Sequence, residues 1–282
     1  MQSAPDQLHE ARDPLAGHAL QRLFEGARTV LRTLSFIARH PRVGRWLLLC
    51  MVAYSIVWGL VIWEAASWQE RVLGALLGPK GAAWWEAALW EVGHFLALIA
   101  WWLFAVVSVF AVSGPLLSPL FGMLAEAAET AFYGTDPVAI DWPQKLREMA
   151  HGALRAAILA VLQIGGSLLF AGTGFLVGLV FPPAGTVIGS VLGGGWSALW
   201  FAQIAMSHAL ENHYVGVGAQ LGLVPRSFAL MLGFGLVGQL FAWLPFAAPV
   251  LVVAGSVLCF RLERSGHVAL PLRRTEIARA AP

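Results

Sequence analysis

A stretch of 55 residues without Asp, Glu, Lys or Arg, from Ala156 to Leu210, constrains the fold of this chain more than any other feature. The hydrocarbon core of a bilayer is about 30 Å thick, and one helical crossing needs roughly 20 apolar residues. The stretch is therefore long enough for two helices, and Pro182-Pro183 near its middle predicts the turn between them. Such a segment is typical of a protein that is embedded in a membrane.

The composition of the whole chain is that of one integral membrane domain. Hydrophobic residues make up 58% of it, charged residues make up 12%, and the mean hydropathy is +0.70. In soluble domains about a quarter of the residues are charged. The net charge of +2 is too small to indicate nucleic acid as a partner. Cys50 and Cys259 both lie in apolar stretches, which favours two buried thiols over a disulfide.

Three further charge-free tracts organise the rest of the sequence, at 46–63, 92–125 and 227–260. The second tract contains helix-breaking residues, namely Gly114-Pro115 and Pro119. They predict that a crossing which begins near His94 ends at Ser113 and that a short new helix follows.

The last tract is too interrupted for a simple span. Pro245 and Pro249 divide it into Ser227–Leu244 and a shorter piece that ends at Phe260. Non-helical backbone is tolerated at membrane depth where protein buries it. The two pieces therefore fit a helical hairpin that dips into the bilayer and returns at least as well as they fit full crossings.

An amphipathic helix is predicted before the first tract. Apolar residues recur there at steps of three and four, with arginines on the other side, and the apolar set is Leu20, Leu23, Phe24, Ala27, Val30, Leu31, Leu34 and Ile37. One alternative is that the helix lies along the inner membrane surface, with its arginines near anionic lipid. The other is that it packs on the cytoplasmic side of the protein itself. Both alternatives place it outside the hydrocarbon core.

Basic residues predict the orientation of the chain. Seven arginines precede Trp46 and five follow Phe260, whereas the loop expected at Glu64–Glu91 has only Arg71 and Lys80. By the positive-inside rule both termini are cytoplasmic, that loop is outside, and the number of complete crossings is even. Tryptophans crowd the loop and its edges, where such rings favour the headgroup level. We therefore expect a multi-pass protein of the cell inner membrane.

Glycine spacing indicates how the helices of the long stretch pack. Gly185, Gly189 and Gly193 repeat at intervals of four residues, and Gly174 and Gly178 repeat the interval on the preceding pass. Small residues at this interval let helix backbones approach closely. We favour packing within the fold or between the subunits of a homo-oligomer, and a glycine-lined permeation path is the alternative.

The sequence does not favour an enzyme, and it predicts no cofactor or metal. The segment Gly195-Trp196-Ser197-Ala198 has the outline of an intramembrane serine-protease loop. That chemistry needs a base on a later membrane helix, and the later histidines lie at or beyond the ends of the predicted spans. His94 and His208 lack Cys or carboxylate partners at ligand spacing.

A motif after the second crossing resembles a known family. The segment Ser118–Glu126, followed by Glu129, is similar to the signature Ala-Pro-Phe-Asn-x-Leu-Leu-Ala-Glu-x-x-Glu of CysZ-type sulfate permeases and the wider etoposide-induced (EI24-domain) membrane family. The motif positions in this chain are Pro119, Gly122, Leu124, Ala125, Glu126 and Glu129. Other matches follow in the family's order and extend from about Leu20 to Leu258, and they include Phe24-Glu25-Gly26, Pro182, Gly185, Gly233-Phe234-Gly235, Leu244-Pro245 and Pro249.

Pattern and resemblance together predict an all-α integral membrane protein. It would have two long transmembrane helices, membrane-inserted helical hairpins and an N-terminal amphipathic interfacial helix. This membrane domain covers residues 16–262, between a flexible segment 1–15 and a basic cytoplasmic tail 263–282. The resemblance also implies a homo-oligomer that passes sulfate or a related oxyanion into the cell for cysteine synthesis. A different class of function, a non-transporting membrane scaffold or interaction protein of the same family, is the alternative.

The resemblance further implies an anion site just before the first span. The family has a Gly-Leu/Ile-Arg-Arg turn there, which binds the anion through backbone amides and guanidinium groups. This chain has Pro41-Arg42-Val43-Gly44-Arg45-Trp46 instead. The implied site is therefore Arg42, Val43, Gly44 and Arg45, of which only Arg45 matches directly. The chain also departs at Ser207-His208-Ala209, where the family usually carries Asp-Tyr-Pro.

Overall fold

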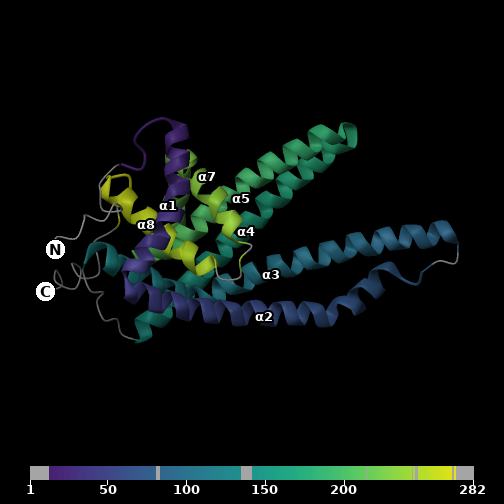
Figure 1. The fold of residues 1–282 in the computed structure, drawn as a ribbon, viewed down its shortest axis with the longest axis horizontal. Helices are drawn as coiled ribbons and strands as arrows, with labels where there is room; N and C mark the ends of the chain where they lie inside the picture. The colour runs from purple at the N-terminus through teal and green to yellow at the C-terminus, as the bar shows by residue number, and fades with distance from the viewer. Residues whose placement is uncertain are drawn as a thin grey trace.

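Two helical arms project from a common root in this protein (Figure 1). The computed structural model describes residues 13–80, 83–134, 142–213, 215–242, 244, 247–268 and 270. Within these ranges the elements are helices only, and in chain order they are α1 (Ala19–Arg39), α2 (Pro41–Leu77), α3 (Trp84–Tyr133), α4 (Trp142–Val180), α5 (Pro182–Asn212), α6 (Val217–Leu221), α7 (Leu223–Ala242) and α8 (Ala247–Arg264).

The arms are two antiparallel helix pairs, α2–α3 and α4–α5, and their tips lie at the same end of the molecule (Figure 1). The root consists of α1, α6, α7 and α8 together with the ends of α2–α5 that pack against them. α1 runs across the direction of the α2–α3 arm (Figure 1). The largest fully buried side chains include Phe36 of α1, Phe234 of α7 and Phe260 of α8. The hydrophobic core of the described residues therefore includes side chains from these three helices of the root.

The prediction of two helices in the long charge-free stretch is confirmed. α4 ends at Val180, Phe181 is extended with φ −143° and ψ 91°, and α5 begins at Pro182. Proline suits the first helical position, because its fixed φ is already helical and its missing N–H would have no intrahelical acceptor there. The two prolines thus start the returning helix.

The predicted break in the second tract is wrong. α3 runs for 50 residues, through Gly114-Pro115 and Pro119, without interruption. A proline inside a helix removes one backbone hydrogen bond, but ending the helix in an apolar environment would leave several backbone groups without partners. α2 also supports this region, because it packs along α3 as its antiparallel partner (Figure 1), and both Tyr54 of α2 and Ser113 of α3 are buried.

The segment Glu64–Glu91, expected to be a loop, is mostly helical. α2 continues beyond Glu64 to Leu77, and α3 begins at Trp84. The indole Nε1 of Trp68 donates to Glu64 Oε2 at 3.3 Å, a contact one helical turn apart. At 1.5 Å per residue, α2 is about 55 Å long, which is well beyond the roughly 30 Å of a hydrocarbon core.

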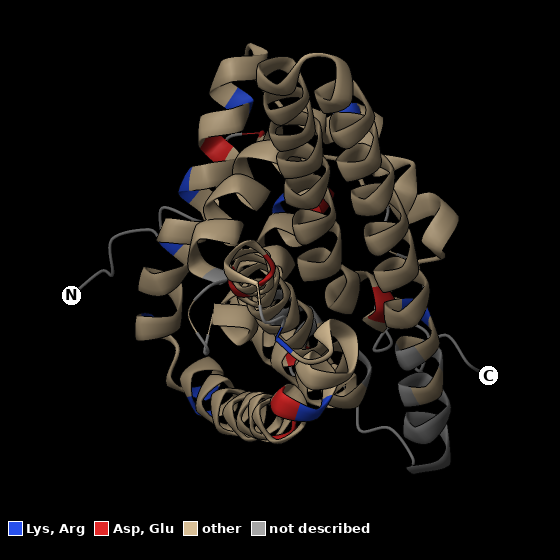
Figure 2. Ribbon diagram, turned by 90° about the vertical axis from the view of Figure 1, so that its right-hand side faces the viewer, with Lys and Arg blue, Asp and Glu red and all other residues tan. Residues whose placement is uncertain are grey.

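Four helices of the described chain are long and apolar enough to cross a membrane. They lie within Pro41–Leu77, Leu154–Val180, Pro182–Asn212 and Leu223–Phe241. Lys, Arg, Asp and Glu, drawn in blue and red, make up only a small part of the ribbon (Figure 2). An all-helical protein with several apolar helices is therefore confirmed, while the division into two long crossings and shorter hairpins stays a prediction. The last tract forms two helices, α7 and α8.

The predicted amphipathic helix is α1, and it packs on the protein itself. Its buried face consists of Gly26, Thr29, Val30, Thr33 and Phe36. A second apolar set on the same helix is exposed, and its members are Leu20, Phe24, Leu31 and Leu34. The helix therefore uses one face for the root and leaves an apolar flank uncovered.

The thiols of Cys50 and Cys259 are buried and unpaired, as the sequence predicts. Residues 1–12 and 271–282, which hold most of the predicted flexible segment and basic tail, lie outside the described residues.

Candidate functional site

The predicted anion-binding residues form the first turn of α2, at the corner where α1 meets it. α1 ends at Arg39, His40 joins the two helices, and Pro41 takes the first position of α2. Arg42 and Arg45 are exposed, whereas Val43 is completely buried. Nothing lies within 4 Å of the position that a Cβ on Gly44 would occupy. Val43 therefore anchors the turn, and both guanidinium groups belong to exposed side chains of the same turn.

The backbone of this turn adds hydrogen-bond donors. The side chain of His40 makes no capping bond to α2, because its ring Nδ1 donates to the carbonyl of Phe36 at 2.8 Å. The amide of Gly44 donates to the carbonyl of His40 at 3.1 Å. The first N–H groups of an α-helix precede its first backbone bond and have no acceptor within the helix. Together with the positive end of the helix dipole and the guanidinium groups, they can bind an anion.

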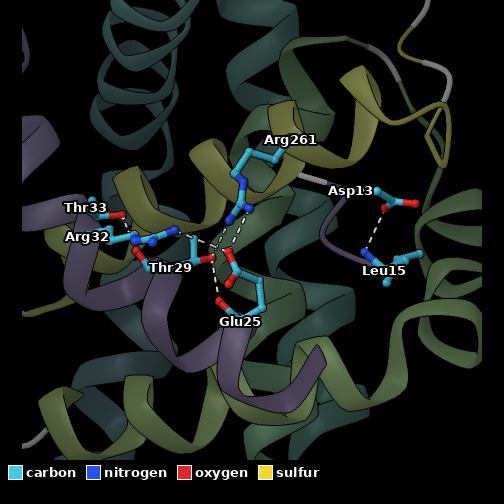
Figure 3. Close-up of polar contacts among 7 residues, drawn as sticks. All are labelled: Asp13, Leu15, Glu25, Thr29, Arg32, Thr33 and Arg261. Atoms are coloured by element: carbon cyan, nitrogen blue, oxygen red, sulfur yellow. Dashed lines mark hydrogen bonds and ion pairs between the residues drawn. The ribbon is translucent and has the colours of Figure 1, made fainter. Parts of the chain in front are cut away.

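A buried arginine anchors α1, the helix that leads into this turn, to α8 (Figure 3). Arg261 of α8 donates to Glu25 Oε1 at 2.7 Å and to Thr29 Oγ1 at 3.0 Å. The guanidinium of Arg32 lies 3.6 Å from the same oxygen of Glu25. Arg261 is only 6% exposed, so this contact joins the first and last helices inside the root. Glu25 belongs to the Phe-Glu-Gly segment that the sequence comparison singled out.

Backbone contacts hold α1 against α7 as well. A Cβ added to Gly26 would lie 2.0 Å from the carbonyl oxygen of Leu230, and one added to Gly233 would lie 1.8 Å from that of Leu23. No side chain fits at either position, so the two backbones touch. The helix that leads to Arg42 and Arg45 is therefore closely packed on the root.

The family-motif residues dock α3 onto the C-terminal end of α5. The carbonyl of Gly122 accepts from Asn212 Nδ2 at 3.1 Å, and His213 Nε2 lies 3.2 Å from Glu129 Oε2. Leu124 and Ala125 are completely buried, and Pro119 and Glu126 are half-buried. In this structure the motif therefore forms a packing surface with polar contacts along it.

The motif lies close to the start of α2. Cys50, little more than one turn after Arg45, donates from Sγ to the carbonyl of Leu120 at 3.5 Å. The structure thus brings the motif and the first turns of α2 together in the root. The residues of the glycine repeat are elsewhere, in the α4–α5 arm near its turn at Phe181 (Figure 1).

In that arm, glycines bring the two backbones into contact. A Cβ on Gly185 would lie 2.3 Å from the Cα of Gly178, and one on Gly174 would lie 2.6 Å from the Cα of Gly189. The position of a Cβ on Gly193 has nothing within 4 Å. Gly185 and Gly189 therefore face the preceding pass, and Gly193 does not.

Sequence reasoning missed a buried polar network around Arg155. Arg155 is 8% exposed. It donates from Nε and Nη2 to Gln220 Oε1, the first at 3.1 Å, and from Nη1 to the carbonyl of Val215 at 2.6 Å. Gln220 Nε2 in turn donates to the carbonyl of Gln203 at 2.8 Å. This chain of bonds ties α4, α5 and α6 together.

One signal for Arg155 was present in the sequence, because it is the last cation before the charge-free stretch begins at Ala156. Its partners are 60 and 65 residues away along the chain. Their identity follows only from the way the helices pack.

Comparison with known proteins places this arrangement in a family. The chain matches the family described as "Sulfate transporter CysZ/Etoposide-induced protein 2.4" over residues 29–252. The match includes the turn with Arg42 and Arg45, the motif in α3 and the whole α4–α5 arm. A search of curated proteins found no match.

Proposed function

The chain belongs to the sulfate transporter CysZ/etoposide-induced protein 2.4 family, and from this premise we propose that it is a membrane permease for sulfate or a related oxyanion. In this proposal the protein is a homo-oligomer of the inner membrane, with both termini in the cytoplasm, and supplies sulfur assimilation. The observation that carries the proposal is the first turn of α2, where backbone donors and two exposed arginines meet.

The chemistry of that turn suits a tetrahedral oxyanion. Sulfate has acceptor oxygens on every side, so it can take hydrogen bonds from backbone N–H groups and from guanidinium groups at once. Arg42 and Arg45 are exposed, which keeps the site wet and the affinity modest. A permeating ion must bind well enough to enter and weakly enough to leave.

The position of the turn supports a role at one mouth of a path. The turn lies in the root, and α2 leads from it toward the arm tips (Figure 1). With the root on the cytoplasmic side, as the arginine-rich N-terminal segment favours, the two arginines would stand at the inner mouth.

The test is uptake of radiolabelled sulfate by proteoliposomes, with sulfite as a competitor. Arg45→Ala should reduce oxyanion affinity roughly ten- to a hundredfold, because a charge-assisted hydrogen bond contributes about 1.5–3 kcal/mol. Arg42→Ala should add to this loss if both guanidinium groups bind one anion. Arg71→Ala is the matched control, since it removes an exposed arginine from the far end of the same helix.

The outcome separates this function from the alternative of a non-transporting scaffold. Folded wild-type protein that neither binds nor conducts sulfate, sulfite or a similar oxyanion would exclude the permease. Equal losses in Arg45→Ala and Arg71→Ala would show that the first turn of α2 has no special role.

A further inference from the structure

We propose that the tip of the α2–α3 arm is a membrane-surface paddle, which lies in the lipid headgroup layer with its α3 side on the lipid and its α2 side in water. The tip consists of residues 64–77 of α2 and 84–101 of α3. This surface is separate from the proposed anion site, and its partner is the phospholipid bilayer itself.

Two indole hydrogen bonds fix the register of the two helices in the tip. Trp101 Nε1 donates to the carbonyl of Ala65 at 3.0 Å, and Trp90 Nε1 donates to the carbonyl of Gly78 at 3.2 Å. Residues 90–101 of α3 therefore lie beside residues 65–78 of α2. In an arm that crosses a bilayer upright, these two segments would lie at the same depth.

The two segments nevertheless differ in how many charged groups they expose. The outer flank of α3 is mainly apolar, with side chains at steps of three and four residues that form one helical stripe: Trp85, Ala88, Leu89, Val92, Phe95, Leu96 and Ile99. Glu91 is the exposed charged residue of this flank. Phe95 and Leu96 are 62% and 60% exposed. The exposed side of α2 in the tip carries more polar groups, namely Glu64, Ser67, Glu70 and Arg71, although Trp68 and Leu76 are exposed there as well. No described residue of α3 between Val92 and Trp101 is charged.

An upright arm does not explain this difference, because the same medium would surround both flanks at each depth. A tip that lies along the membrane surface does explain it, since one flank then meets acyl chains and the other meets water. The length of α2 requires some such arrangement. A helix of about 55 Å must tilt, bend or protrude when the hydrocarbon core is roughly 30 Å thick.

Some charged groups of the tip and of the turn beside it contact tryptophans or each other, as expected for the headgroup layer. Lys80 Nζ lies 2.6 Å from Glu91 Oε1 and 5.6 Å from the ring centre of Trp90. The guanidinium of Arg71 lies 5.4 Å from the ring centre of Trp68. Indole rings favour this layer because one edge is polar and the body is apolar.

The exposed apolar side chains continue along α3 beyond the tip, and this favours lipid as the partner. The exposed apolar side chains of the tip continue toward the root with Phe104, which is 63% exposed. The stripe therefore continues along the helix beyond the tip, which suits a surface in contact with acyl chains better than an isolated patch for a protein.

The experiment compares spin labels at two positions of the tip in reconstituted full-length protein, Phe95→Cys on α3 and Ser67→Cys on α2. Val92→Cys is a second α3 position in case the first variant fails to fold. Wild-type protein is the labelling control, because Cys50 and Cys259 are buried. We expect the α3 label to collide more often with oxygen, which partitions into lipid, than with a water-soluble nickel chelate. The α2 label should show the opposite preference.

Each other outcome contradicts the paddle. Preference for the nickel chelate at both positions would mean that the tip projects into water. Preference for oxygen at both would mean that it is sunk in hydrocarbon. An α3 label that is immobile and shielded from both reagents would mean that protein, such as a second copy of the chain, covers the stripe. None of these results depends on whether the chain transports an anion.

Discussion

The root and the α4–α5 arm are held together by different kinds of contact. In the root, buried or half-buried charged groups meet across helices, as with Arg261 and Glu25, 2.7 Å apart, or Arg155 and the carbonyl of Val215, 2.6 Å apart. In the described part of the α4–α5 arm, the contacts include backbone approaches at glycines and ring packing, with Trp196 5.5 Å from Phe170. A neutral hydrogen bond, from Trp196 Nε1 to the carbonyl of Gln163 at 3.2 Å, joins the same two helices.

This difference teaches which force acts in each region. Apolar side chains gain nothing from meeting each other in lipid, so helices there associate where small residues let backbones approach. Buried charges must be matched to specific partners, because an unmatched one is costly. In the root, the charged partners therefore determine which helix surfaces pack together. The turn that is proposed to bind the anion also lies in the root.

The largest expected effect is a loss of stability in the pairing of α4 with α5. Gly185→Leu would place a side chain where a Cβ alone comes within 2.3 Å of Gly178, and we expect it to destabilise the α4–α5 pairing by about 3 kcal/mol. Gly193→Leu is the control on the same helix, because its Cβ position is open. Thermal unfolding in detergent measures both variants. If they unfold together with the wild type, backbone contact does not hold the arm.

A smaller effect is expected from removing the buried cation of the root. Arg155→Met keeps much of the apolar length but leaves the oxygens of Gln220 and Val215 without their donor. A buried acceptor without a partner costs about 1–3 kcal/mol, so we expect a loss of about 2 kcal/mol in the free energy of unfolding. Arg71→Met, at an exposed position, should change it little. Equal losses in the two variants would show that burial of Arg155 is unimportant.

The smallest effect concerns the pair of Glu25 and Arg261. A double-mutant cycle with Glu25→Gln and Arg261→Met should give a coupling of about 1 kcal/mol, because the carboxylate is still partly open to water. Its side chain is 26% exposed. The coupling should fall when salt is added, whereas the effect of Gly185→Leu should not. A coupling of zero would mean that this ion pair does not help to hold α1 on the root.

Sequence reasoning succeeded where local chemistry decides the structure. The turn at Pro182-Pro183 follows from the absence of charge on both sides and from the backbone of proline. The α1 helix follows from its apolar periodicity. The same reasoning failed at Gly114-Pro115, where the local preference of proline is overruled because α3 stays supported by its neighbour and an interrupted helix would expose backbone groups to an apolar environment.

The candidate site was only partly predictable. The position of Arg42 and Arg45 before an apolar helix is visible in the sequence, and so is the resemblance that gives them a role. The buried role of Arg155 is not visible, because its partners Val215 and Gln220 come from α6 and the segment before it. The sequence also does not show that Gly185 contacts the preceding helix and Gly193 does not, since both fit the four-residue repeat and only packing distinguishes them.

The most direct test of an anion-binding turn in the root is hydrogen–deuterium exchange of the reconstituted protein with and without sulfate, with chloride at equal ionic strength as the reference. Peptides that cover the first turn of α2 should exchange more slowly when sulfate binds, because a bound anion holds the start of the helix. Peptides from the arm tips should not change. If the first turn of α2 exchanges equally fast with and without saturating sulfate, or if Arg45→Ala leaves the protection intact, the central claim is contradicted.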